Sequence, residues 1–244
     1  MRNSILFMLL TLFSTTYSQI NDSIVKNLST TKKKPSFSDS FSMGFKISPT
    51  ISWLDVNHND LQTDGATITG GLGFVAEYEI NTIISVVSGL NISLPGGYVF
   101  DNASMSDANT KNNFRINFTS LDMPFLMRVN LTNDNKNVFF VQGGAYIDYS
   151  FSATEFHKAS RYSLPDIKTS ITPLINPIQF YYSFGFGTKH KFFRKYSVFA
   201  EVNYKYSITD IASEKGFINA ARYTPISIPE IKSGNVVFSA GVLF

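Results

Sequence analysis

The protein has 244 residues, of which 43% are hydrophobic, 15% aromatic and 16% charged, with no cysteine and a formal net charge of +3. This apolar content excludes an intrinsically disordered chain, and the lack of cysteine excludes disulfide scaffolds, thiolate metal sites and thiol catalysis. The charge is too small over this length to indicate nucleic-acid binding, so no nucleic-acid partner is expected.

The first 18 residues have the features of a secretory signal peptide. Arg2 supplies a positive charge, Ile5 to Phe13 forms an apolar run, and Ser18 offers a small residue for cleavage. The apolar run has about nine residues and a membrane-spanning helix needs about 20, which favours a cleaved signal over a retained anchor. Residues 19–40 include three consecutive lysines from Lys32 and show no apolar periodicity, so they are predicted to form a flexible periplasmic leader.

From residue 41 onward, apolar and polar residues alternate with a period of two, the pattern of a β-strand with two different faces. Eight such segments are predicted to be strands: Met43–Trp53, Thr67–Ile80, Ile84–Ser93, Phe114–Leu131, Phe139–Phe151, Ile178–Lys189, Tyr196–Ile208 and Val236–Phe244. The fourth segment changes phase, because its polar positions shift from Arg115 to the even-numbered Asp122 and Arg128. A β-bulge near Ser120 or Leu121 would restore a single polar face.

The length of these segments favours a membrane barrel. Most have about 9 to 14 residues, whereas strands of soluble proteins usually have about 5 or 6 and tilted transmembrane strands about 9 to 11. The predicted connections alternate between long ones (57–65, 100–113, 152–176 and 209–235) and short ones (81–82, 133–137 and 191–195). Outer-membrane barrels have this arrangement, with short periplasmic turns and longer extracellular loops.

An open sheet edge in hydrocarbon would leave unpaired backbone groups, each costing several kcal/mol, so the sheet must close. The predicted fold class is therefore all-β: residues 41–244 form an eight-stranded antiparallel up-and-down transmembrane β-barrel, integral to the bacterial outer membrane and in contact with its lipid. Aromatic residues are predicted to form girdles at the two membrane surfaces: Trp53, Tyr98, Tyr149, Tyr204 and Tyr206 outside, and Tyr78, Phe193, Tyr196 and Phe244 on the periplasmic side.

The most specific motif is SLDMPFLMRV (Ser120 to Val129), in which Leu, an acid, an apolar residue and Pro precede an apolar run that ends in a basic residue. Together with GLGFVAEYEIN from Gly71, VQGGAYIDY from Val141 and FAEVNYKYSITDI from Phe199, it resembles the PorT-like outer-membrane β-barrel proteins, often called porin-family proteins. The resemblance implies the barrel fold and a place in the Gram-negative envelope. PorT itself serves a secretion and gliding apparatus.

The last residues, VVFSAGVLF, alternate through Ala240 and Val242 to a terminal Phe244. This ending resembles the signal by which the barrel-assembly machinery recognises its clients. The resemblance therefore implies that machinery as a partner.

Charged residues on the polar faces are predicted to line the barrel lumen: Lys46, Arg115, Arg128, Lys189, Lys205, Glu77, Glu79, Asp122, Asp148 and Glu201. An eight-stranded barrel is just wide enough for side chains to fill it, so these charges are predicted to pair as a plug. A selective pore is the alternative, but it would more plausibly show a surplus of one sign at a constriction.

Three histidines lie near candidate partners: His58 beside Asp55 and Asp60, His157 near Glu155 and Ser160, and His190 in a predicted periplasmic turn. None belongs to a pattern typical of barrel enzymes, and the spacing of His58 with its aspartates is weak evidence for a metal site. No catalytic residue, cofactor or metal ligand is therefore assigned, and each histidine is interpreted as a solvated loop or turn residue.

The two longest loops carry aromatic residues, charges of both signs and prolines, and binding usually resides in such loops on a rigid scaffold. The predicted function is a non-enzymatic outer-membrane barrel that acts in binding, or in envelope or secretion-machinery assembly, through its extracellular loops or its periplasmic leader. The partner is an extracellular ligand or another envelope protein. A small-solute porin and a lipid-A-modifying or proteolytic enzyme remain as alternatives.

Overall fold

The computed structural model describes residues 40–57, 61–101, 112–132, 136–157, 167–192, 196–213 and 230–244. The predicted signal peptide, nearly all of the predicted leader and Phe193 lie outside the described residues. The strands are β1 (Phe41–Ile47), β2 (Thr50–Asn57), β3 (Leu61–Thr69), β4 (Gly71–Glu79), β5 (Ile84–Ser93), β6 (Gly96–Asp101), β7 (Asn112–Asn130), β8 (Asn137–His157), β9 (Ile167–Ser170), β10 (Ile178–Lys191), β11 (Ser197–Ser207) and β12 (Glu230–Leu243), with one 3-10 turn, η1 (Thr172–Leu174). No described helix is long and apolar enough to cross a membrane.

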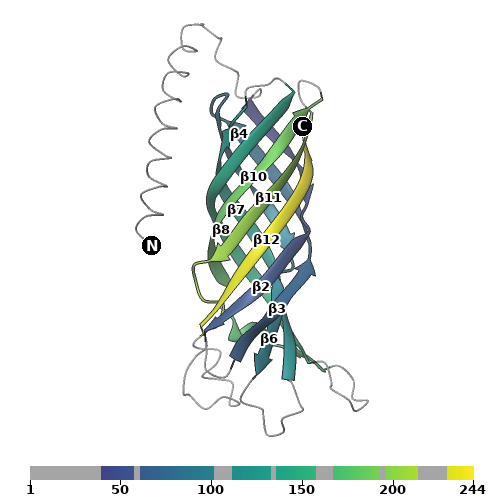
Figure 1. Ribbon diagram of the computed structural model, residues 1–244, viewed down its shortest axis with the longest axis vertical. Coiled ribbons are helices and arrows are strands. Elements are labelled where there is room, and N and C mark those ends of the chain that lie inside the picture. The colour runs from purple at the N-terminus through teal and green to yellow at the C-terminus, as the bar shows by residue number, and fades with distance from the viewer. Residues whose placement is uncertain are drawn as a thin grey trace, which may run out of the picture. The chain divides into compact units, whose positions relative to one another are not determined.

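All strands belong to one antiparallel sheet that closes on itself (Figure 1). Closure occurs at β12, which pairs on one side with β11 and on the other with both β1 and β2. Beyond the last ladder pair, Met43 and Phe244 exchange backbone hydrogen bonds of 3.0 and 2.7 Å. The predicted all-β antiparallel barrel is therefore confirmed.

The number of strands differs from the prediction. The described residues form twelve strands where eight were predicted, although these strands occupy a ring of eight positions. The first predicted strand is interrupted at Pro49, the second at Gly70, and the third continues past Pro95 into β6. Proline has no N–H to donate to a ladder, which explains two of the three interruptions. The fourth addition, β9, is a short strand beside the outer part of β8.

The predicted β-bulge is present at the expected height but on the neighbouring strand. Thr119 of β7 pairs with Ser152 and Ser120 pairs with Ser150, so Phe151 of β8 is the extra residue. The inward residues of β7 are even-numbered all the way from Phe114 to Arg128. Along the strand they change from apolar to largely polar, but the alternation itself is not interrupted. The prediction was wrong about the strand because it assumed a polar interior along the whole barrel.

The interior in fact has two zones. Toward the end with the short turns, charged and polar residues point inward and apolar residues cover the outside. The inward residues there also include a second, smaller apolar cluster: Val75, Val87, Leu126, Tyr146, Tyr181, Phe199 and Leu243. Toward the opposite end, where Figure 1 shows β2, β3 and β6, the inward residues form the outer apolar cluster: Leu54, Val99, Phe114, Ile116, Phe118, Ala153, Ile171, Ile175, Ile211, Ala212 and Ile231. Strands that leave hydrocarbon for water need this inversion, because apolar surface must then be buried inside.

The second zone explains the length of the central strands. β7 has 19 residues and β8 has 21, well beyond the 9 to 11 or so that a tilted transmembrane strand requires. The first predicted long loop, 57–65, is shorter than expected, because β2 ends at Asn57 and β3 already begins at Leu61. The barrel wall therefore continues past the region that matches a bilayer.

Two connecting segments complete the outer apolar cluster. Ile175 forms an isolated bridge with Ala212, and the Ser213 amide donates to the Leu174 carbonyl at 2.9 Å. The Ile211 amide donates to the carbonyl of Ile231 in β12 at 2.8 Å. These bonds hold the segment around η1 and the segment after β11 against the same apolar cluster, which therefore draws on loops as well as strands.

The two zones predict different accessibility for neighbouring residues of β7. The chain has no cysteine, so single cysteines can be introduced. In intact vesicles, Asn117→Cys should react with a membrane-impermeant maleimide because it faces water. The adjacent Ile116→Cys should not react until the protein is unfolded, because its side chain lies in the outer apolar cluster.

A lipid-facing control, Phe184→Cys on β10, should also stay unlabelled in vesicles but react in the unfolded chain. Equal labelling of Asn117→Cys and Phe184→Cys would contradict the assignment of two zones.

Candidate functional site: the buried charges of the barrel interior

Nine charged side chains from six strands lie in the interior of the barrel. They are Lys46 (β1), Glu77 and Glu79 (β4), Asp122 and Arg128 (β7), Asp148 (β8), Lys189 (β10), and Glu201 and Lys205 (β11). Each occupies an inward position of its alternating strand, and all are buried except Glu79, which is partly exposed. All nine were among the ten residues predicted to line the lumen.

Arg128 is the centre of the larger of two clusters. Its Nη1 lies 3.0 Å from a Glu77 oxygen and its Nη2 lies 2.9 Å from a Glu201 oxygen. Its Nε donates to Gln142 at 3.0 Å, and the Phe140 ring lies 3.8 Å from the guanidinium carbon. Because the side chain is only 1% exposed, protein groups must replace the water that would otherwise solvate the charge.

Two lysines complete this cluster. The Lys189 ammonium lies 2.9 Å from Glu77 and 3.0 Å from Glu79, and Lys46 lies 3.7 Å from Glu201. The cluster therefore holds three buried cations and three carboxylates, and the exposed Lys191 also lies 3.7 Å from Glu79 at its edge. Such a balanced arrangement is stable only with all partners present, since removing one would leave a buried charge without compensation.

The smaller cluster is centred on Lys205. Asp122 of β7 and Asp148 of β8 are direct cross-strand neighbours, an arrangement in which like charges repel. The Lys205 ammonium lies 3.0 Å from Asp122 and 2.6 Å from Asp148, so one cation holds both carboxylates. The rings of Tyr146 and Tyr181 lie 4.8 and 4.3 Å from the same ammonium, which adds cation–π attraction.

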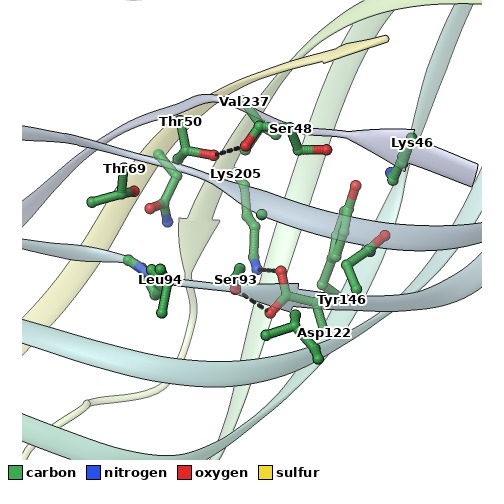
Figure 2. Close-up of a pocket in the computed structure, with 15 residues that line it drawn as sticks. Lys46, Ser48, Thr50, Thr69, Ser93, Leu94, Asp122, Tyr146, Lys205 and Val237 are labelled. Carbon is green, nitrogen blue, oxygen red and sulfur yellow. Dashed lines mark hydrogen bonds and ion pairs between the residues drawn. The ribbon is translucent and has the colours of Figure 1, made fainter. Parts of the chain in front are cut away.

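A small cavity adjoins the Lys205 cluster (Figure 2). Its volume is about 30 Å³, and Lys46, Asp122 and Lys205 are among its lining residues. Asn91 and Asn235 also line it, and a polar site of this volume accommodates one or two water molecules. The cavity is much too small to hold a nutrient-sized solute.

Arg115 corrects the predicted lumen network. It lies on the outward face of β7, where its guanidinium is 5.9 Å from the Tyr98 ring and its Nε donates to Asn117 at 2.8 Å. The reason is the inversion of the two zones: at this height the inward positions of β7 are Phe114 and Ile116, which belong to the outer apolar cluster.

Sequence reasoning missed the buried aromatic residues that support the charges. Tyr146, Tyr181 and Phe140 all point inward and are nearly or fully buried. Phe140 and Tyr146 alternate in step with the polar Gln142 and Asp148 on β8, and Tyr181 alternates in step with Gln179 on β10. This alternation could have identified the three rings as inward-facing. They were missed because aromatic residues of a membrane barrel were assumed to face lipid.

The histidine candidates gain no support from the described residues. His58, Asp60, Ser160 and the side chain of His157 lie outside them. Asp55 accepts a hydrogen bond from the Tyr206 hydroxyl at 2.8 Å, and His190 contacts the side chain of Asn137. Across the described ranges, no group of three or more His, Cys, Asp or Glu side chains is placed to hold a metal ion.

The residues of the predicted assembly signal lie on the outer face of β12 and at its end. Ala240, Val242 and Phe244 are all exposed on that face. Phe244 also lies near Phe45, with 6.2 Å between the ring centroids. Recognition by the assembly machinery stays a prediction.

The chain is similar to a known protein family and to several solved outer-membrane proteins. A family model described as outer membrane protein beta-barrel domain matches residues 19–213. The chain is similar to the structure of the outer membrane protease OmpT from Escherichia coli, with 11% identity, a TM-score of 0.46, and coverage of 87% of this chain and 99% of that one. It is also similar to neisserial surface protein A (9% identity, TM-score 0.43, coverage 84% and 97%) and to OprG from Pseudomonas aeruginosa (12%, 0.41, 82% and 96%). No curated protein sequence matches.

The Arg128 cluster predicts a large and specific loss of stability. Arg128→Met leaves Glu77 and Glu201 buried without their main cation, so the free energy of unfolding should fall by about 3 to 5 kcal/mol. Urea-dependent unfolding in lipid vesicles, followed by the emission of the single tryptophan, Trp53, measures this change.

Arg115→Met is the matched control and should cost less than about 1 kcal/mol, because that arginine lies on the outer face and takes part in none of the buried ion pairs described above. Adding Glu77→Gln to Arg128→Met should recover part of the stability, because Lys189 keeps Glu79 and Lys46 keeps Glu201. An equal loss in the two arginine variants would contradict the central role of Arg128.

Proposed function

The chain belongs to the outer membrane protein beta-barrel domain family and is integral to the outer membrane, and from this we propose that it is a non-enzymatic barrel that acts by binding. The barrel serves as a rigid support. Its partner is either an extracellular ligand bound by the long loops or another envelope protein bound by the loops or the periplasmic leader.

The observation that carries this proposal is the filled interior. Arg128, Glu77 and Glu201 bridge the lumen from β7, β4 and β11. The outer apolar cluster occupies the same interior at a second height. A water-filled passage would have to break buried ion pairs at one level and separate packed apolar side chains at the other, so these two layers favour a scaffold over a small-solute porin.

The proposed binding surfaces are the two longest loops. These loops carry charged and aromatic residues that lie outside the described residues: Lys158, Arg161, Tyr162, Asp166, Glu214, Lys215, Phe217, Arg222 and Tyr223. The described flanks of these loops, β9 and η1 on one side and residues 208–213 on the other, are tied to the barrel by backbone hydrogen bonds. Loops anchored in this way suit recognition on a rigid scaffold.

Envelope or secretion-machinery assembly is the form of this function that the PorT-like resemblance favours. The predicted leader supports this role, because its three consecutive lysines from Lys32 suit an acidic surface of a second envelope protein. We propose this role as the first to test.

Planar-bilayer recording tests the filled interior. The purified full-length protein should add no reproducible conductance steps to a bilayer, because the described side chains fill the interior with ion pairs at one level and apolar groups at the other. A matched preparation of a known open barrel checks that insertion occurs. Stable, reproducible steps from the wild-type protein would favour the porin alternative and contradict the proposal.

Gentle purification from the native outer membrane tests the assembly role. A tag placed near Ser36 leaves Phe244 unmodified, and mass spectrometry should identify a reproducible partner in stoichiometric amount. Two deletions then locate the surface that binds this partner: deleting residues 214–229 removes most of the last long loop, and deleting residues 19–34 removes most of the leader. One of the two variants should lose the partner. Recovery of the barrel with lipid alone would count against assembly and leave an extracellular ligand.

A further inference from the structure

Asp122 and Asp148, here called the aspartate pair, face a single cation in the interior of the barrel. They are direct cross-strand neighbours on β7 and β8, and the Cβ atoms of such neighbours are about 5 Å apart. Their side chains are 9% and 1% exposed, so water is almost excluded from both carboxyl groups. Among the described side chains, Lys205 is the only cation within ion-pair distance of either one. Two ionised carboxylates would therefore leave one surplus negative charge.

The four oxygen atoms of the aspartate pair are not equally satisfied. In Asp122, one oxygen lies 3.0 Å from the Lys205 ammonium and the other accepts a hydrogen bond from the Ser93 hydroxyl at 2.7 Å (Figure 2). In Asp148, Oδ2 lies 2.6 Å from the same ammonium. Its Oδ1 is buried and has no hydrogen-bond partner among the described residues. A buried carboxylate oxygen without a donor is energetically costly.

The strands on either side of the aspartate pair bring no second positive charge. Asp122 is the register partner of Asn91 on β5, and Asp148 is the register partner of Gln179 on β10. Both of these neighbours are neutral amides. The Tyr181 hydroxyl, also on β10, donates to Gln179 at 2.6 Å.

The other titratable groups around the pair also leave its surplus charge uncompensated. Lys46 of β1 lines the same small cavity as Asp122, but its ammonium pairs with Glu201 in the balanced Arg128 cluster. Tyr146 and Tyr181 direct uncharged rings toward the ammonium that the aspartates share. From β12, the neutral Asn235 lines the cavity.

We propose that the aspartate pair holds one proton at neutral pH, so that the pair and Lys205 together are electrically neutral. The proton converts one carboxyl group into a neutral acid and supplies an O–H donor. Two carboxyl groups this close and this deeply buried favour one shared proton over two negative charges. The pair is therefore a pH-sensitive element of the barrel. Loss of its proton in alkaline medium places an unbalanced charge between β7 and β8 and weakens their pairing.

Infrared spectroscopy of the full-length protein in phosphatidylcholine vesicles detects this proton directly. A protonated carboxyl group absorbs apart from ionised carboxylates, so the wild-type protein should show an acid band at neutral pH. A heavy-isotope label in the aspartate carboxyl carbons should shift the band and so distinguish aspartate from glutamate. Asp148→Asn should abolish the band, because Asp122 and Lys205 then balance each other. Asp210→Asn, which changes an exposed aspartate, should retain it.

The pH dependence of unfolding gives a second measurement. Aspartates of the unfolded chain are ionised at neutral pH, so unfolding releases the proton of the pair and stability falls as the pH rises. The unfolding constant of the wild-type protein, relative to that of Asp148→Asn, should rise about tenfold for each pH unit around neutrality. Urea titrations followed by Trp53 emission measure this ratio. Asp210→Asn should keep the wild-type dependence.

An absent acid band in the folded wild-type protein at neutral pH would overturn the proposal, because both aspartates would then be ionised. An equal pH dependence of unfolding in the wild type and Asp148→Asn would overturn it as well. The infrared result comes from the wild-type protein alone, so it does not depend on the folding of a variant. Both results are independent of the conductance and co-purification experiments.

Discussion

Backbone hydrogen bonding in hydrocarbon is the constraint from which the rest of this structure follows. An N–H or C=O group without a partner costs several kcal/mol there, so the sheet has to close. Closure is made by β12, which pairs with β1 near its end and with β2 near its start. A ring of eight positions leaves an interior only as wide as the side chains that fill it, and every inward residue must therefore find its partners among other inward residues.

The buried charges satisfy this requirement in two ways. Around Arg128, three cations and three carboxylates balance each other, and Gln142 and Phe140 complete the coordination of the guanidinium. Around Lys205, two facing aspartates share one ammonium group between aromatic rings. Both arrangements join strands that are distant around the ring, so the charges act as crosslinks through the lumen and hold the wall at a fixed diameter.

The period-two pattern predicted the faces of most strands, and nine of the ten charges that it assigned to the interior lie there, because alternation is a local property of a strand. It could not tell which face points inward, since an apolar-out strand in lipid and an apolar-in strand in water have the same alternation. Arg115 and the β-bulge were misplaced for this reason. The partners of each charge also could not be predicted, because Lys205 meets Asp122 and Asp148 through the register of three strands rather than through sequence spacing.

The change from a polar to an apolar inward face along the barrel also indicates where this protein can interact with other molecules. Inside, the charges are already paired and the outer end is packed with apolar side chains, so the lumen has little capacity left for a ligand. Outside, the change from apolar to polar residues along β2 and β12 concentrates rings, hydroxyls and charges at one height. Above that height the wall continues as a water-facing β-structure that anchors η1 and the segment after β11. The binding role proposed for this barrel therefore belongs to its outer surface and its ends, for which the filled interior provides a rigid base.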